Sequence, residues 1–228
     1  MDVQTILDRL KAQADPNAVA NAKRFGIYTT KAYGISAPKL RATAKSIGKN
    51  HTLAMQLWAT AIDDARIVAV LIDDPKQVTE AQMEAWAKDF DNWGVVDGAC
   101  SILFDKTPFA YQKATEWSSR EEEFVKRAGF VLMAVLAVHD KRAKDEIFLP
   151  FLPIIKRESY DERNFVKKGV NWALRQIGKR NLALNEVAIQ TGLEIQALGT
   201  KAGRWTAADA LRELRSEAVQ TRLQRKKK

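Results

Sequence analysis

The sequence predicts an all-α fold built from stacked helix pairs. Apolar residues recur at helical spacing along most of the 228 residues, and we find no convincing pair of strands. Eleven glycines and six prolines argue against an all-β protein with many tight turns. Short gapless similarities at intervals near 40 residues are a third observation. Together these features favour a helical repeat protein.

The expected helices follow one another with short breaks. Start signals support three of them, because Ser36 precedes a helix with Pro38 just inside it, and Thr79 and Asp161 precede others. Breaks are expected at Gly48, after residues 74–75 and 107–108, and at Gly178. In chain order, apolar residues at helical spacing occupy 3–12, 37–49, 52–61, 65–72, 79–90, 92–104, 124–138, 146–157, 164–181, 183–198 and 204–214.

Two internal alignments suggest the repeat unit. EFVKRAGFVLMAVL at 123 aligns with NFVKKGVNWALRQI at 164, a spacing of 41, and KKGVNWALR at 167 aligns with RWTAADALR at 204, a spacing of 37. Such spacings, with one helix pair per unit, are those of HEAT or armadillo arrays. A solenoid of this kind stacks helix pairs and leaves a concave face for an elongated partner.

The charge is moderately basic. Lys and Arg number 37 against 28 Asp and Glu, a formal charge of +9, which is typical of chains that meet phosphate backbones or anionic membranes. The terminal RLQRKKK holds five of these cations, so the rest of the chain carries about +4. We expect one domain over residues 1–215 and a disordered basic tail over 216–228.

Composition narrows the class of protein further. Cys100 is the only cysteine, which excludes internal disulfides and cysteine-ligated zinc or iron–sulfur sites, and His51 and His139 have no metal-binding spacing. We therefore expect no metal and no cofactor. The start of the chain lacks a secretory signal, and no apolar run reaches the length of a membrane span. A cytoplasmic monomer that does not contact membranes is the simplest interpretation.

One candidate site lies in DNWGVVDGACSILF. Trp93 and Asp97 are one turn apart, opposite the expected core stripe, and an aromatic plate beside a carboxylate suits a cation. Gly94 and Gly98 would keep this surface low, so that another molecule could approach the backbone. The alternative is that Trp93 packs on a neighbouring repeat and Asp97 pairs with a nearby cation.

Two further helices carry ambiguous signals. Arg127 stands in a helix that is apolar on nearly every side and needs an anion there, either Glu123 one turn back or a bound phosphate. Trp172 lies off the apolar stripe of its helix, near Lys168 and Arg175. It could fill a groove between repeats, or it could help to hold a nucleic acid, as aromatics interleaved with cations do.

These segments resemble the AlkD family, the alkylation-repair DNA glycosylases built from HEAT-like repeats. The resemblance is carried by LWATAIDDARIVAVLI, MEAWAKDFDNWGVVD, FVKRAGF and FVKKGVNWALRQIGKRN, in the order and spacing of the family, and it extends from about Tyr33 to Arg212. Asp64 stands where the family leads us to expect glutamate, a departure that concerns structure more than catalysis. The stretch AKRFGIYTT matches only loosely.

The resemblance implies a right-handed superhelical solenoid of HEAT-like helix pairs with a concave basic face. It further implies that Asp97 is the catalytic aspartate, that Trp93 and Trp172 line the lesion, and that Arg127 holds the DNA backbone there. The substrate would be duplex DNA carrying purines alkylated at N3 or N7, excised without a base-flipping pocket. The further cations that we expect to contact the backbone are Lys126, Lys168, Arg175 and Lys179.

A single carboxylate is chemically sufficient for this reaction. Glycoside hydrolysis ordinarily needs a second carboxyl group to protonate the leaving group. An alkylated purine of this kind is already cationic and leaves as a neutral base, so Asp97 need only stabilise the oxocarbenium-like sugar and orient water. Two other functions remain open at this stage: a non-catalytic scaffold that binds protein or peptide, and a module that binds distorted DNA or RNA without cutting it.

Overall fold

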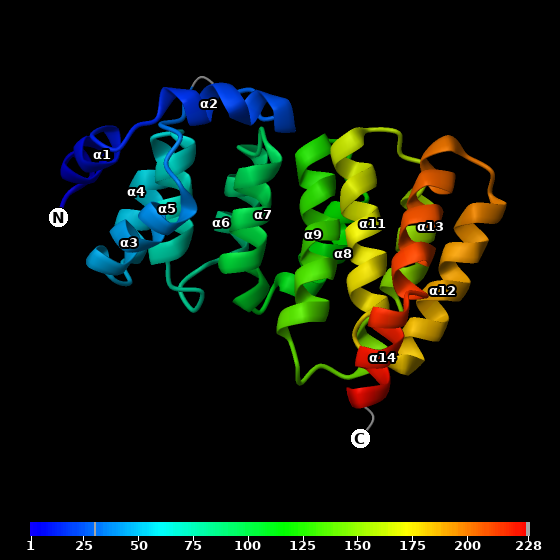
Figure 1. Ribbon diagram of the computed structural model, residues 1–228. Coiled ribbons are helices and arrows are strands. Elements are labelled where there is room, and N and C mark those ends of the chain that lie inside the picture. The colour runs from blue at the N-terminus through cyan, green and yellow to red at the C-terminus, as the bar shows by residue number, and fades with distance from the viewer. Residues whose placement is uncertain (30, 227–228) are drawn as a thin grey trace. The chain divides into compact units, whose positions relative to one another are not determined.

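The computed structural model describes residues 1–29 and 31–226. They form helices joined by short connections, with no strand in those ranges (Figure 1). No described helix is long and apolar enough to cross a membrane. The helices are α1 (Val3–Lys11), α2 (Pro16–Ala22), η1 (Lys23–Phe25), α3 (Ala37–Ile47), α4 (His51–Ala59), α5 (Asp63–Ile72), α6 (Glu80–Lys88), α7 (Trp93–Ile102), η2 (Phe104–Lys106), α8 (Ala110–Ser118), α9 (Glu123–His139), η3 (Asp145–Ile147), α10 (Phe151–Glu158), α11 (Asn164–Gly178), α12 (Leu182–Ala197), α13 (Lys201–Leu214) and α14 (Glu217–Lys226).

The chain divides into two compact units, where the sequence led us to expect one domain over residues 1–215. The first unit is Met1–Thr107 and the second is Pro108–Lys228. The boundary between the units coincides with the helix break that the sequence predicted at Thr107-Pro108, where proline disfavours a helical residue before it. Each unit is described by itself below.

In the first unit, α5 packs against α3, α4 and α7. The indoles of Trp58 and Trp86 stack with ring centroids 3.9 Å apart, and both side chains are buried. Asp64 at the start of α5 is also buried, and its carboxylate accepts hydrogen bonds from the backbone N–H groups of Tyr33 (2.5 Å) and Ile35 (2.8 Å). Asp64 therefore anchors the segment before α3, in agreement with the structural role expected for it.

In the second unit, α9 packs against both α8 and α11 (Figure 1). All residues of α9 from Val125 to Ala137 are buried, as the apolar sequence of this helix predicted. Gly129 permits the close approach of α8, since a Cβ there would lie 2.5 Å from the backbone nitrogen of Ser118. The aligned stretches at 123 and 164 form neighbouring helices, α9 and α11, and their rings of Phe124 and Phe165 are 5.6 Å apart.

The segment expected to be a disordered tail contains a helix instead. α14 runs from Glu217 to Lys226 and packs on α13 through Val219 and Leu223, which are both buried and one turn apart. The side-chain amide of Gln220 donates to the backbone oxygen of Leu214 at 2.7 Å. Burial of these two apolar side chains outweighs the charge of the segment. Residues 227–228 lie outside the described residues.

Candidate functional site

Asn92 fixes the start of α7 in the first unit. It is the N-cap, buried, and its side-chain oxygen accepts a hydrogen bond from the N–H of Val95 at 3.1 Å. The amide group of the same side chain donates to Asp63 at 3.1 Å and to Asp91 at 2.9 Å. The first turn of α7, which carries Trp93, is thus held by a buried polar network.

Trp93 and Asp97 occupy the partly exposed face of α7. Both side chains are half-buried, whereas Val95, Val96, Ala99 and Cys100 are buried on the other side of the helix. The indole Nε1 of Trp93 donates to the backbone oxygen of Phe25 at 2.9 Å, which fixes the ring on the N-terminal segment. The predicted one-turn spacing on a non-core face is confirmed, so the carboxylate of Asp97 lies beside an oriented indole.

The two glycines of α7 differ in what surrounds them. A Cβ at Gly98 would lie 2.7 Å from the Cδ1 atom of Ile67, so Gly98 allows α5 to approach α7. A Cβ at Gly94 would lie 3.4 Å from the Cδ1 atom of Ile27, which is an ordinary contact distance, and Gly94 lines a cavity of about 210 Å³ in the first unit. The expectation that these glycines leave room for another molecule therefore stays a prediction at Gly94, whereas the side chain of Ile67 occupies that space at Gly98.

The carboxylates of Asp63 and Asp91 lie beside Asn92, the N-cap of α7. Burial, together with the charge of Asp91, raises the pKa of Asp63 to about 6. Asp63 is the first residue of α5 and accepts the hydrogen bond from Asn92, so this titrating group is linked directly to the N-cap of α7.

Lys126 in the second unit is not placed as a surface contact. It is 6% exposed, and its ammonium group lies 2.6 Å from Glu158 and 3.3 Å from Asp161, which are both buried. Arg163 donates to Asp161 as well. Although burial raises the pKa of Asp161, the hydrogen bonds from Arg163 and the charge of Lys126 hold it below its ordinary value. This buried network corrects the expectation that Lys126 contacts DNA.

Arg127 is buried between α9 and α11. Its Nη1 donates to the backbone oxygen of Phe165 at 2.8 Å, and its stem passes the position of Gly169. The sequence left Glu123 and a bound phosphate as its candidate partners. The hydrogen bond to Phe165 shows that part of the guanidinium stabilises the first turn of α11. The guanidinium is held in a fixed orientation by this bond.

Trp172 lies where the helical spacing of α11 predicted. It is half-buried, whereas Val170 and Ala173 on the neighbouring stripe are buried. Lys168, one turn before it, is exposed and has no ion-pair partner within 1–29 and 31–226. Its position beside an indole is suited to a phosphate contact.

The two cations that follow Trp172 are less available than the sequence suggested. Arg175 and Lys179 both contact the carboxylate of Glu213 on α13, the lysine at 2.5 Å. Burial raises the pKa of Glu213, but the hydrogen bonds from Lys179 and Arg175 lower it further, so the net shift is downward. The cationic face of α11 is partly neutralised by this acid.

Exposed aromatic and cationic side chains also lie in the N-terminal stretch AKRFGIYTT, from which the sequence predicted no site residue. Phe25 and Tyr28 are 67% and 78% exposed, and Lys23 and Arg24 stand just before them. The bond from Trp93 to Phe25 places this segment beside α7. Its signal in the sequence was the interleaving of aromatics with cations, the same signal that drew attention to Trp172.

Comparisons with known proteins agree with the resemblance. Residues 6–214 match the model of a family described as DNA alkylation repair enzyme. A solved structure described as "A new family of proteins related to the HEAT-like repeat DNA glycosylases with affinity for branched DNA structures" has a TM-score of 0.75 and 22% identity, over 85% of this chain and 83% of that chain. That likeness shows a shared helical fold. No curated protein matches the chain significantly.

Proposed function

Since this chain belongs to the DNA alkylation repair enzyme family, we propose that it is a DNA N-glycosylase. It hydrolyses the N-glycosidic bond of positively charged purines alkylated at N3 or N7 in duplex DNA. The observation that carries this proposal is the position of Asp97, a partly exposed carboxylate one turn after an indole whose orientation is fixed.

The chemistry follows from the charge of the lesion. As the bond between sugar and base breaks, positive charge moves from the alkylated base to the deoxyribose. A carboxylate next to the sugar stabilises that charge more in the transition state than in the ground state, and it can orient the attacking water. The face of Trp93 adds cation–π attraction to the same developing charge. The departing base is neutral and needs no acid.

Contacts with the DNA backbone are assigned to exposed groups on each unit. In the second unit, Lys168 beside Trp172 is the best placed exposed cation, and the buried side chain of Arg127 lies against Gly169, the residue that follows Lys168. In the first unit, Lys23 and Arg24 stand just before the exposed ring of Phe25. Binding through such contacts weakens steeply with salt, because counterions are released from DNA.

The experiment is excision from a duplex that contains one N7-methylguanine. The purified protein should generate an abasic site, and Asp97→Asn should bind the duplex with unchanged affinity while its excision rate falls about 100-fold or more. Asn keeps the size of the side chain and removes only its charge. Equal excision by the variant and the parent would remove Asp97 from the mechanism.

A second candidate function is the binding of branched DNA without excision. It is favoured by the solved structure with the same fold, whose description gives that affinity to a related protein. In this case a four-way junction would bind more tightly than a linear duplex of the same length, and the parent protein would release no alkylated base. The two assays on the same preparation separate the candidates.

A further inference from the structure

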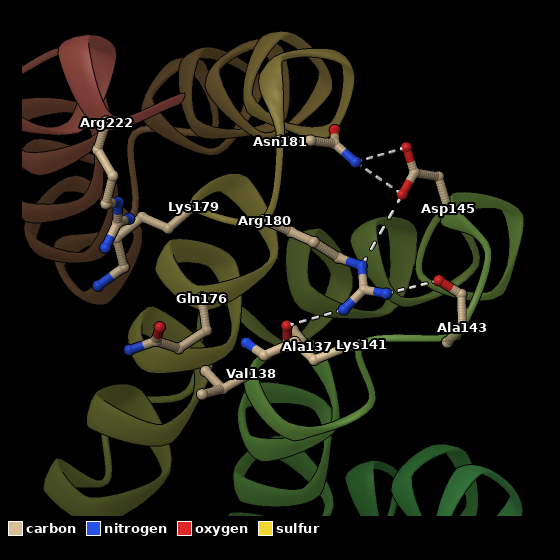
Figure 2. Close-up of a pocket in the computed structure, with 10 residues that line it drawn as sticks. All are labelled: Ala137, Val138, Lys141, Ala143, Asp145, Gln176, Lys179, Arg180, Asn181 and Arg222. Carbon is tan, nitrogen blue, oxygen red and sulfur yellow. Dashed lines mark hydrogen bonds and ion pairs between the residues drawn. The ribbon is translucent and has the colours of Figure 1, made fainter. Parts of the chain in front are cut away.

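The second unit contains a cationic pocket that the proposed chemistry does not use. Its volume is about 370 Å³, and it lies at the C-terminal ends of α9 and α11, against α14 (Figure 2). Among the described residues, four cations and one carboxylate lie in its wall, and no aromatic ring does. The charged and amide side chains that matter for its binding properties are Lys141, Asp145, Lys179, Arg180, Asn181 and Arg222.

Arg180 forms a rigid part of this wall. Its guanidinium donates to the backbone oxygens of Ala137 (3.1 Å) and Ala143 (2.5 Å) and lies 4.4 Å from the ring centroid of Phe148. The oxygen of Ala137 belongs to the last turn of α9, so Arg180 offsets the negative end of that helix. Figure 2 shows the guanidinium directed at the backbone oxygens of Ala137 and Ala143 and at the carboxylate of Asp145.

The carboxylate in the wall, that of Asp145, is already engaged. Both oxygens of Asp145 accept from the amide of Asn181 at 2.8 Å, and Arg180 lies 3.8 Å away. Lys179 is likewise engaged, by Glu213 outside the wall. These bonds fix the acidic group of the pocket without cancelling the charge of its remaining cations.

Two cations of the pocket remain open to an external anion. Lys141 and Arg222 are exposed, and neither has an ion-pair partner in the part of the chain that the structure describes. They come from segments 81 positions apart in the sequence, one after α9 and one in α14. Cations continue in the sequence beyond Arg222, with arginine at 225 and lysine at 226–228.

The chemistry of the wall identifies the ligand as a phosphate group. Guanidinium and ammonium groups suit phosphate oxygens, whereas the described part of the wall offers no aromatic ring on which a nucleobase could stack. A water occupies about 30 Å³ of liquid, so the cavity has room for a phosphate and several waters. We propose that the pocket binds a backbone phosphate of DNA through Lys141 and Arg222, as an anchoring site separate from Asp97.

This proposal rests on the proposed function in one respect, that DNA is the ligand. The part of the pocket wall that α9 contributes begins at Ala137, ten residues after Arg127, which corresponds to about 15 Å of helix. A phosphate held there is not the one beside the fixed guanidinium of Arg127. The pocket therefore adds to the affinity of the protein for DNA and to the salt dependence of that affinity, and it takes no part in bond cleavage.

The test measures the affinity of the full chain for an undamaged duplex over a range of NaCl concentrations. In Lys141→Gln/Arg222→Gln, the slope of log K against log salt should become shallower by about 0.9, because the one phosphate that both side chains hold is no longer neutralised. The control is Arg142→Gln/Lys144→Gln, which removes the same charge from exposed residues of the same connection that do not line the pocket. The control should keep the slope of the parent.

The outcomes separate the pocket from the catalytic proposal. If both double variants keep the salt slope of the parent, or if the slope becomes shallower by the same amount in both, the pocket is not a DNA site. Excision by the parent would then still support the glycosylase. If inorganic phosphate raises the melting temperature of the parent but not of Lys141→Gln/Arg222→Gln while duplex slopes are equal, the site takes free anions and the DNA assignment fails. A selective loss of slope supports the anchor even where Asp97→Asn excises normally.

Discussion

Replacement of Lys126 by methionine tests whether this lysine belongs to a buried ion-pair network and not to a surface that contacts DNA. Lys126 lies between two buried carboxylates, Glu158 at 2.6 Å and Asp161 at 3.3 Å. Removing one partner of a buried pair costs about 3–5 kcal/mol, because a charge is left without compensation. Glu158 keeps Arg157 at 2.6 Å and Asp161 keeps Arg163 at 2.6 Å. We therefore expect the lower end, about 3 kcal/mol.

The assay is urea and thermal denaturation of the Lys126→Met variant beside DNA binding. A loss of about 3 kcal/mol corresponds to a melting temperature lower by roughly 10 °C. The folded-state pKa of Asp161 is depressed, so the network stabilises the protein above the ordinary pKa of aspartate and loses that contribution as the pH falls further. The penalty should therefore shrink below about pH 4.

DNA binding by the same variant supplies the refutation. While the protein is folded, Lys126→Met should bind a duplex with the salt dependence of the parent. Lys168→Gln is the matched variant, because Lys168 is an exposed cation on α11, and its loss should reduce the salt slope by about 0.9 with little change in stability. The reasoning fails if Lys126→Met is as stable as the parent and has lost salt dependence.

Three further variants test charge in the first unit and packing in both units. The free energy of unfolding of Asp63→Asn should exceed that of the parent by about 1 kcal/mol at pH 8 and by almost nothing near pH 4, because the raised pKa of Asp63 means that the parent loses stability as the pH rises toward about 6. An equal gain at both pH values would contradict the assigned pKa. Gly129→Ala should lose about 2 kcal/mol, since its Cβ would meet the backbone of Ser118 at 2.5 Å, whereas Gly98→Ala meets only the end of a flexible side chain. Equal denaturation midpoints for the two alanine variants would show that the α8–α9 approach is not restrictive.

The helical organisation could be predicted because local pattern and burial agree. α9 is apolar on nearly every side and is buried from Val125 to Ala137, so its sequence alone predicts both the helix and its burial. α14 was missed for the opposite reason. Its apolar residues, Val219 and Leu223, stand alone in a strongly charged stretch, and the surface that covers them is contributed by α13. Hydrophobic periodicity detects a helix only when enough apolar residues repeat.

The candidate site was predictable where a role depends on one helix. The half-buried positions of Trp93, Asp97 and Trp172 follow from helical spacing alone. The state of Lys126 does not, since its carboxylate partners are 32 and 35 positions further along the chain. A cation that meets DNA and a cation that meets a buried acid have the same local sequence, so tertiary contacts decide between them.

The most direct test of the proposed enzyme is the single-turnover rate of N7-methylguanine release from a duplex, compared among the parent, Asp97→Asn and Asp8→Asn. The last variant removes the same charge from an exposed residue of α1. We predict that the parent and Asp8→Asn release the base at equal rates and that Asp97→Asn is about 100-fold slower or worse at saturating protein. Release by Asp97→Asn at the parent rate, or none by the parent, would contradict the account.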